Sequence, residues 1–271
     1  MNRLVDKSLR SLLGVISRPA CQPLLEALHR ATLAGMNIGP AGDPLASGEA
    51  RVLRYCARLS SPDGRWIVFD VGANQGAYAL LAASLGGPAA QVYCFEPSPA
   101  AFKRLTANTA RAANIHTFNF GLAETDGEAT LYGNEPGSGI ASLDRRHLDH
   151  FGIAVEAQEV VRLRTLDAVR EELGRPHIRL LKLDIEGHEI KALQGARRSL
   201  EEGAIDSIQF EFGGANIDSR TYFRDFFELL AGRYRLYRVL RQGLRPLPRY
   251  RETHENFLTA NYLAVSKALD A

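Results

Sequence analysis

The chain has 271 residues, of which 45% are hydrophobic and 24% are charged, and its formal net charge is +2. These values are ordinary for a soluble globular protein, and the length allows one large domain or one domain with an appendage. The near balance of charge gives no argument for a nucleic-acid partner, and none is expected.

The three cysteines, Cys21, Cys56 and Cys94, lie far apart and form no C-x-x-C pair. Isolated thiols in odd number favour reduced, mostly buried cysteines. A chain of this length can bury a core without disulfides. We therefore expect a cytoplasmic protein.

The N-terminal region carries leucines at helical spacing with basic residues between them, which predicts amphipathic helices over residues 1–35. The glycine- and proline-rich segment 37–48 ends this region, and a further helix is expected over 49–59. We therefore divide the chain into a helical extension, 1–60, and a domain, 61–271. The extension is expected to pack on the protein or close a pocket, with peripheral membrane contact as the alternative. No run of about 18 apolar residues occurs, so no integral membrane segment is expected.

From residue 66 onward, apolar strands alternate with helical stretches. Strands are expected at 67–70, 91–95, 116–120, 179–184, 207–212, 235–240 and 262–266, and helices at 78–84, 100–112, 189–201 and 222–230. This alternation predicts an α/β domain with a mostly parallel sheet and helices on both faces. The last two strands have no helix between them, so they are expected to pair in antiparallel fashion.

The first strand leads into a glycine turn, W-I-V-F-D-V-G-A-N-Q-G-A-Y at 66–78. A strand that ends at Asp70, two glycines at Gly72 and Gly76, and a helix start are the parts of a nucleotide-cofactor site. Glu96 ends the next strand 20 residues after Gly76, where an acidic residue grips ribose hydroxyls. The end of the third strand, 119–124, should flank an adenine.

The glycine turn distinguishes between two adenosine cofactors. In the G-x-G-x-x-G pattern of dinucleotide folds the middle glycine lets the backbone approach a pyrophosphate, but this chain has Asn74 there and Ala77 at the sixth position. S-adenosylmethionine has no phosphate, and its ammonium and sulfonium tolerate an acid such as Asp70. The turn therefore favours S-adenosylmethionine, and an NAD-type oxidoreductase is the alternative.

A second motif, L-L-K-L-D-I-E-G-H-E at 180–189, is an apolar strand that ends in ionisable residues. Asp184, Glu186, His188 and Glu189 would cost desolvation energy at the ligand edge of a sheet unless they are solvated, paired or used.

Four stretches together resemble the FkbM family of S-adenosylmethionine-dependent methyltransferases. They are F-D-V-G-A-N-Q-G-A-Y, C-F-E-P-S-P, L-R-T-L-D and L-K-L-D-I-E-G-H-E, and the resemblance covers about residues 66–213. It implies a class I methyltransferase (Rossmann-like) fold with a seven-stranded sheet whose last strand is inserted antiparallel. It also implies methyl transfer, usually to a hydroxyl of a sugar, polyketide or related natural product.

The resemblance assigns roles to individual residues. Asp70, Gly72, Asn74 and Gly76 would line the methionine end of the cofactor, Glu96 would hold the ribose, Gly121 and Leu122 would touch the adenine, and Asp184 would face donor and acceptor. O-methylation also requires alignment of a hydroxyl and a base for its proton. Asp184, Glu186 and His188 are the candidates, although the histidine could instead cap a helix or bond a neighbouring strand.

Several features leave alternatives open. No metal is expected, although Asp184 and Glu211 offer oxygen ligands. The glycine-rich segment 133–143 either closes over an acceptor or forms a plain surface loop. The arginine-rich segment 238–251 either meets an anionic substrate or forms a solvated hairpin. A cofactor-binding scaffold without activity is the non-enzymatic alternative, and the sequence does not indicate an oligomeric state.

Overall fold

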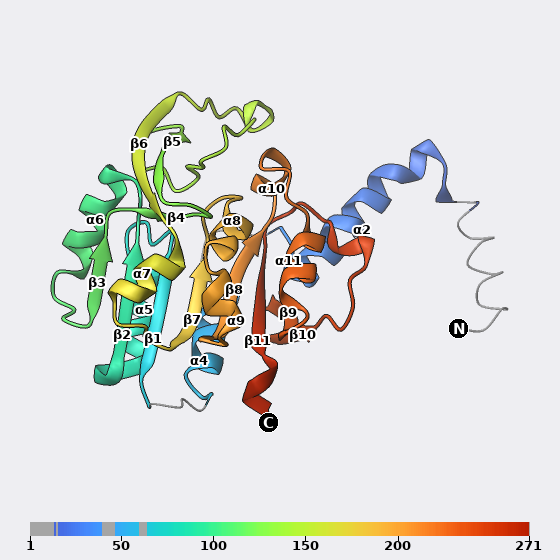
Figure 1. Cartoon of the computed structure of the whole chain (residues 1–271). Coiled ribbons are helices and arrows are strands. Elements are labelled where there is room, and N and C mark those ends of the chain that lie inside the picture. The colour runs from blue at the N-terminus through green and yellow to red at the C-terminus, as the bar shows by residue number, and fades with distance from the viewer. Residues whose placement is uncertain (1–13, 15, 40–46, 60–63, 271) are drawn as a thin grey trace.

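A computed structural model describes residues 14, 16–39, 47–59 and 64–270 (Figure 1). The helix expected over the first 13 residues lies outside this part. The N-terminal region contains the short helix η1 (Pro19–Cys21), α2 (Gln22–Gly35) and α4 (Glu49–Cys56). Most of α2 projects from the body of the protein (Figure 1), and its residues Leu24 and Leu28 are accordingly 65% and 53% exposed. Its C-terminal end is anchored by Leu33 and by Ile38 beyond it, which are buried.

An eight-stranded sheet with the order β10-β9-β11-β8-β7-β1-β2-β3 forms the centre of the molecule. Its strands are β1 (Trp66–Val71), β2 (Ala90–Phe95), β3 (Ile115–Phe118), β7 (Ile178–Leu183), β8 (Ile205–Phe212), β9 (Tyr234–Leu240), β10 (Gly243–Pro246) and β11 (Ala260–Ser266). The strands β3, β2, β1, β7 and β8 are parallel, and β11 is inserted antiparallel between β8 and β9. The predicted antiparallel pairing of the last two expected strands is confirmed.

The central strands are buried on both faces. Every residue of β1 and β7 is buried, which is the pattern of parallel strands covered by helices. One face packs against α7 (Leu166–Glu172), α8 (Glu189–Gln194) and α11 (Phe223–Leu230), and the other against α4, α5 (Ala77–Gly86) and α6 (Pro99–Thr109). The expected α/β architecture is therefore confirmed. The domain boundary proposed at residue 60 stays a prediction, and α4, which lies before that boundary, packs into the same core as α5.

Two details of the sheet and its helices differ from expectation. The sheet has eight strands rather than seven, because the chain turns back after β9 and adds β10 at the edge. The helix expected over 189–201 is divided into α8 and α9 (Arg197–Glu201). Gly195 lies at the division, where a Cβ would overlap the carbonyl oxygen of Ala123, so the backbone just after β4 packs directly against the end of α8.

A second sheet was not expected. It has three strands, β4 (Gly121–Leu122), β5 (Gly127–Gly133) and β6 (Ala157–Arg164), in the order β4-β6-β5. Most of β6 is exposed or half-buried, so its sequence lacks the apolar run of a core strand. Figure 1 shows this sheet above the carboxyl edge of the main sheet. The sheet is part of the connector between β3 and β7, which therefore lies over the carboxyl ends of the parallel strands.

The motif L-R-T-L-D joins two helices. The Thr165 hydroxyl accepts the Ala168 N–H at 3.3 Å and begins α7. The Asp167 carboxylate accepts the N–H groups of Arg198 and Ser199 at 2.8 and 2.9 Å, at the start of α9. Side-chain oxygens that accept the first N–H groups of a helix stabilise its start, so this motif has a structural role.

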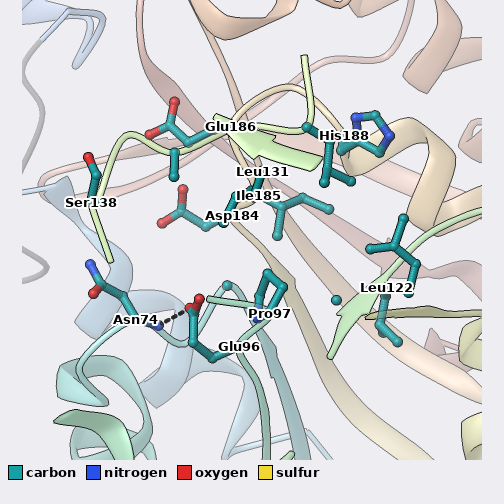
Figure 2. A pocket seen from close by; sticks show the side chains of 16 residues that line it. Asn74, Glu96, Pro97, Leu122, Leu131, Ser138, Asp184, Ile185, Glu186 and His188 are labelled. Atoms are coloured by element: carbon teal, nitrogen blue, oxygen red, sulfur yellow. Dashed lines mark hydrogen bonds between the residues drawn. The ribbon is translucent and has the colours of Figure 1, made fainter. Parts of the chain in front are cut away.

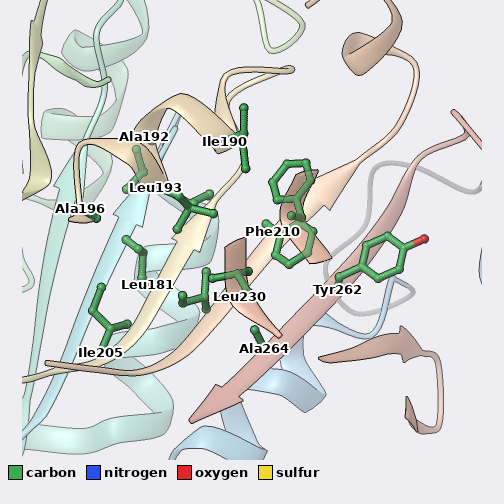
Figure 3. Close-up of a cluster of buried hydrophobic side chains, with 14 of the residues drawn as sticks. Leu181, Ile190, Ala192, Leu193, Ala196, Ile205, Phe210, Leu230, Tyr262 and Ala264 are labelled. Atoms are coloured by element: carbon green, nitrogen blue, oxygen red, sulfur yellow. The ribbon is translucent and has the colours of Figure 1, made fainter. Parts of the chain in front are cut away.

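The aromatic cluster on the α11 face should dominate stability (Figure 3). The Phe210 ring lies 4.5 Å from that of Phe226 and 5.5 Å from that of Tyr262, and Phe210 is fully buried. We expect F210A to lower the free energy of unfolding by about 3–5 kcal/mol, because the change leaves a cavity. Urea denaturation followed by circular dichroism measures it. The control V160A, at a 71% exposed position, should change stability by less than about 0.5 kcal/mol; equal losses would contradict the assignment.

Candidate active site

The glycine turn after β1 is built by close backbone contacts. Gly72 has a φ of +77°, and a Cβ there would overlap the carbonyl oxygen of Asp184. Asn74 also has a positive φ, +46°, which asparagine tolerates better than most residues. Gly76 has a φ of +87°, and a Cβ there would lie 2.9 Å from Leu105 Cδ1. Gly72 therefore brings the turn against the loop after β7, whereas Gly76 permits packing of α6.

Glu96 joins the turn to the end of β2. Its carboxylate accepts the N–H groups of Asn74 and Ser98 at 2.8 and 2.9 Å, and the first of these bonds is drawn in Figure 2. Burial raises the pKa of Glu96 to about 7, although the two hydrogen bonds oppose this shift. The Asn119 amide donates to the carbonyl oxygens of Glu96 and Pro97. The ends of β2 and β3 are thereby fixed side by side.

These loops surround a pocket, which we call the glycine-loop pocket (Figure 2). Its polar lining includes Asn74, Glu96 and Asp184, and its apolar lining includes Leu122 and Leu131. A mainly apolar pocket with a few placed polar groups suits a ligand with an aromatic ring and hydroxyls.

A row of buried charges lies beneath the turn. Lys182 Nζ is 3.4 Å from Asp70 Oδ1 and 3.2 Å from Asp184 Oδ2. It also lies 5.0 Å from the centre of the Tyr78 ring. Burial raises the pKa of Asp70, and Lys182 opposes this shift. Burial by itself would lower the pKa of Lys182, but the neighbouring carboxylates outweigh it and raise that pKa. Lys182 therefore stays charged.

A second cavity, the polar chamber, adjoins the glycine-loop pocket. Both are lined by Gly72, Asn74 and Asp184. The remaining polar lining of the chamber includes Ser47, Glu49, Tyr78, Lys182, Glu211, Thr259 and Asn261. Sequence reasoning missed Ser47 and Glu49, because the segment before β1 was assigned to a separate extension.

Glu49 is held in the chamber by two side chains. Its carboxylate accepts the Gln209 amide at 3.0 Å and the Ser47 hydroxyl at 2.8 Å. Gln209 in turn accepts the Tyr78 hydroxyl at 2.9 Å. Burial raises the pKa of Glu49, while Lys182 lowers it. Glu49, at the start of α4, therefore presents a fixed acidic group close to the turn.

The loop after β7 is stabilised by the connector. Glu186 has a φ of +52°. Its carboxylate lies 2.6 Å from Arg146 Nη1, and its carbonyl oxygen accepts the Ser142 hydroxyl at 2.7 Å. Burial raises the pKa of Glu186 to about 8, with Asp184 adding to the shift and Arg146 opposing it. No local pattern in the sequence indicated Arg146 or Ser142, because their contacts with Glu186 span 40 and 44 residues.

The other two ionisable residues of this loop face different partners. Glu189 accepts the N–H groups of Ile185 and Gly187 at 3.0 and 3.1 Å, so it fixes the loop. His188 Nδ1 lies 3.3 Å from Asp144 Oδ2, and burial lowers the pKa of this histidine. Figure 2 shows the His188 ring at the far end of the pocket from the carboxylates of Asp184 and Glu186.

Three carboxylates converge where the pocket and the chamber meet. Oxygen atoms of Asp184, Glu186 and Glu211 all lie within 4.8 Å of one another. Burial raises the pKa of Glu211 well above its usual value, and the neighbouring acids add to the shift. Such a group can share protons, and its oxygen atoms are also of the kind that bind a divalent cation.

The glycine-rich segment 133–143 covers the pocket rather than forming a plain surface loop. Its Gly137 N–H donates to Glu159 at 3.1 Å, and the Ser98 hydroxyl donates to the same carboxylate at 2.8 Å. Ser138 and Gly139 line the glycine-loop pocket. Glu159 of β6 therefore fastens the segment to the start of α6.

The predicted site residues divide into two groups. Those that line the glycine-loop pocket are Gly72, Asn74, Glu96, Gly121, Leu122, Asp184, Glu186 and His188. Asp70 and Gly76 line neither cavity: Asp70 is fully buried beneath the turn, and Gly76 faces α6. The individual roles assigned to these residues stay predictions.

The order of the strands defines a class I methyltransferase-like fold, with five parallel strands and an antiparallel strand inserted beside β8. A family model described as the methyltransferase FkbM domain matches residues 70–239. The chain therefore belongs to the FkbM methyltransferase family. Across the described residues, no helix is both long and apolar enough to cross a membrane.

Relatives of this chain include proteins named as methyltransferases. It is 28% identical to the hexuronic acid methyltransferase AglP of Haloferax volcanii over 167 residues, which are 61% of this chain and 64% of that protein. It is 27% identical to the 2-O-methyltransferase NoeI of Sinorhizobium fredii over 151 residues, 52% of this chain and 61% of NoeI. The crystal structure of an FkbM methyltransferase from Methylobacillus flagellatus has a TM-score of 0.44 and 17% identity, covering 77% of this chain and 47% of that one. The chain spans less than two thirds of each.

The raised pKa of Glu96, about 7 when folded, predicts a pH-dependent stability. The folded chain binds this proton more tightly than the unfolded chain, so the stabilisation is complete below pH 4.5 and is lost as the pH rises through 7. We expect the wild type to lose about 2–3 kcal/mol of unfolding free energy relative to E96Q between pH 5 and 8. Urea denaturation at several pH values tests this. E124Q, at an exposed position, should follow the wild type; parallel curves for E96Q and wild type would refute it.

Proposed function

We propose that this protein is an S-adenosylmethionine-dependent O-methyltransferase that acts on a hydroxyl of a sugar, glycan or polyketide-type natural product. The observation that carries the proposal is the junction of two cavities at Gly72, Asn74 and Asp184, one mainly apolar and one polar. Relatives named as a hexuronic acid methyltransferase and a 2-O-methyltransferase support the sugar acceptor. The proposed location is the cytoplasm, in keeping with three free cysteines.

The adenosine of the cofactor would occupy the glycine-loop pocket. Each oxygen of the Glu96 carboxylate accepts one backbone N–H, which leaves a lone pair on each for the two ribose hydroxyls. Leu122 and the neighbouring Gly121 would flank the adenine. S-adenosylmethionine has no pyrophosphate for the glycine turn to accommodate. The Asn74 side chain fills the space between this turn and the segment 133–143, since a Cβ added at Gly139 would lie only 3.2 Å from Asn74 Nδ2. These features favour S-adenosylmethionine over NAD.

The amino acid tail of the cofactor would extend into the polar chamber. Its ammonium group needs an acid, and Glu49 presents a buried carboxylate there. The sulfonium would then lie at the junction beside Asp184. A cationic donor is favoured there, because the carboxyl oxygens of Asp184, Glu186 and Glu211 converge at this junction, and a cation beside them would favour their charged forms.

Asp184 is the proposed proton acceptor. It lines both cavities, and its side chain is 38% exposed, so a hydroxyl that enters the chamber can reach both this carboxylate and the methyl group. Glu186 is engaged by Arg146, which suits a role in shaping the loop. His188 is paired with Asp144 away from the junction, which suits a structural role.

Cofactor titrations test the proposal directly. We expect wild-type protein to bind S-adenosylmethionine, S-adenosylhomocysteine and 5′-methylthioadenosine in a calorimeter, and not NAD. E96A should weaken all three by at least tenfold, because they share the ribose. E49Q should weaken the first two by at least tenfold but leave methylthioadenosine, which lacks the tail, within twofold. The proposed function would be refuted if the protein bound NAD tightly, or if it bound none of the adenosine ligands. Wild-type affinity of E49Q for S-adenosylmethionine and S-adenosylhomocysteine would refute only the placement of the amino acid tail.

The base assignment predicts a graded loss of turnover. On an acceptor identified by screening hydroxylated sugars and metabolites, D184N should lower kcat by about 10²–10⁴-fold. It should leave S-adenosylhomocysteine affinity within threefold. H188Q should lower kcat by less than tenfold. Near-normal turnover of D184N would exclude Asp184 as the base. Loss of activity in a chelator, restored by Mg²⁺, would instead assign the three carboxylates to a metal.

A further inference from the structure

A third pocket lies at the edge of the main sheet, between the C-terminal end of α2 and the segment after β10. We call it the arginine pocket, because its charged lining consists of Arg238, Arg245, Arg249, Arg251 and His254. No aspartate or glutamate lines it within the described residues. Ile38 provides part of its apolar wall.

The arginines of this pocket lack the partners that arginines usually have. In the part of the chain that the structure describes, none of the four forms an ion pair, whereas at least eight other arginines do. Glu255, which follows His254 in the sequence, already accepts hydrogen bonds from other groups. Its carboxylate accepts the N–H groups of Phe223 and Arg224 and the Tyr250 hydroxyl. Among the described residues, no carboxylate therefore forms an ion pair with the arginines of the pocket, although Glu255 lies close enough to act on the pKa of His254.

Arg238 shows most clearly that this arrangement is unfavourable without a ligand. It is half-buried on β9, and its buried Nε has no hydrogen-bond partner among the residues that the structure describes. Burial lowers the pKa of Arg238, and Arg245 lowers it further. An unpaired buried donor and neighbouring like charges are unfavourable unless a ligand satisfies them. The His254 ring accepts the Arg251 N–H on Nδ1 at 3.2 Å, so its neutral form carries hydrogen on Nε2 as a further donor.

The arginine pocket is close to the polar chamber. Arg238 pairs with Tyr262 of β11, and the adjacent Asn261, which lines the chamber, pairs with Glu211 of β8. Strands lie about 4.8 Å apart, so β9 and β8 are separated by roughly 10 Å. Consecutive side chains point to opposite faces. The two cavities therefore flank the start of β11 from opposite faces, at the same edge of the sheet.

We propose that the arginine pocket binds the phosphate or diphosphate group of the methyl acceptor. Guanidinium groups bind phosphate oxygens in a bidentate manner. The four arginines of the pocket carry a positive charge that suits a group with several negative charges, such as a phosphate or diphosphate, better than a single carboxylate. An acceptor anchored there would carry its sugar over the edge of the sheet to Asp184. The acceptor is then a nucleotide-linked or carrier-linked sugar, and a reaction that forms a sugar diphosphate precedes this one. The acceptor role rests on the proposed methyltransferase function.

Binding of inorganic pyrophosphate to the full chain tests the pocket at about 0.15 M salt, where weak surface attraction is screened. We expect one site in a calorimeter. R238Q and, separately, R249Q should weaken it by at least tenfold. The matched control is R241Q, an exposed arginine of the same hairpin outside the pocket, which should change the affinity by less than twofold. All three variants should keep wild-type affinity for S-adenosylhomocysteine.

Three results would overturn the proposal. They are no pyrophosphate binding by the wild type, an equal loss in R241Q, or binding to anionic phospholipid vesicles without binding to pyrophosphate, which would indicate a membrane surface. The acceptor role has its own test: with S-adenosylhomocysteine bound, D184N should weaken a nucleoside diphosphate sugar but not pyrophosphate. Pyrophosphate binding without S-adenosylhomocysteine binding would refute the methyltransferase function and leave an anion site alone.

Discussion

A single buried cation permits the carboxyl ends of β1 and β7 to come together. Lys182 lies between Asp70 and Asp184, and its side chain is only 5% exposed. Without it, the fully buried carboxylate of Asp70 and the nearby carboxylate of Asp184 would have no cation between them, and their like charges would repel each other. Because Lys182 compensates them, the turn after β1 can press against the loop after β7 at Gly72. Both cavities of the candidate active site are lined by these two loops.

The rest of the site is supplied by segments that lie outside the parallel core. The connector between β3 and β7 forms a second sheet, from which Glu159 fastens the cover and beside which Arg146 orients Glu186. The segment before β1 contributes Glu49 to the polar chamber. Such additions are free to vary while the sheet stays the same, so they are where acceptor choice can be set on a common methyltransferase scaffold.

Charge is sorted along the edge of the sheet. Carboxylates gather at Asp184, Glu186 and Glu211, and arginines without an ion pair among the described residues gather around Arg238, one strand beyond β11. The net charge of +2 hides this separation. A cationic methyl donor and an anionic acceptor would each find a complementary site under the proposed function. Electrostatic complementarity of this kind governs the orientation of a ligand more than its overall affinity.

The sequence alone determined the α/β class, the strands β1, β2, β7 and β8, and the residues Gly72, Glu96 and Asp184, because apolar runs and turn glycines are local signals. The family followed from the same motifs and was confirmed by the match over 70–239. Only the tertiary structure decided that β4, β5 and β6 form a second sheet, that Asp70 and Gly76 line neither cavity of the site, that Arg146 pairs with Glu186, and that Glu49 and Arg238 line cavities. Those facts depend on contacts between residues far apart in the chain, for which spacing along the sequence carries no signal.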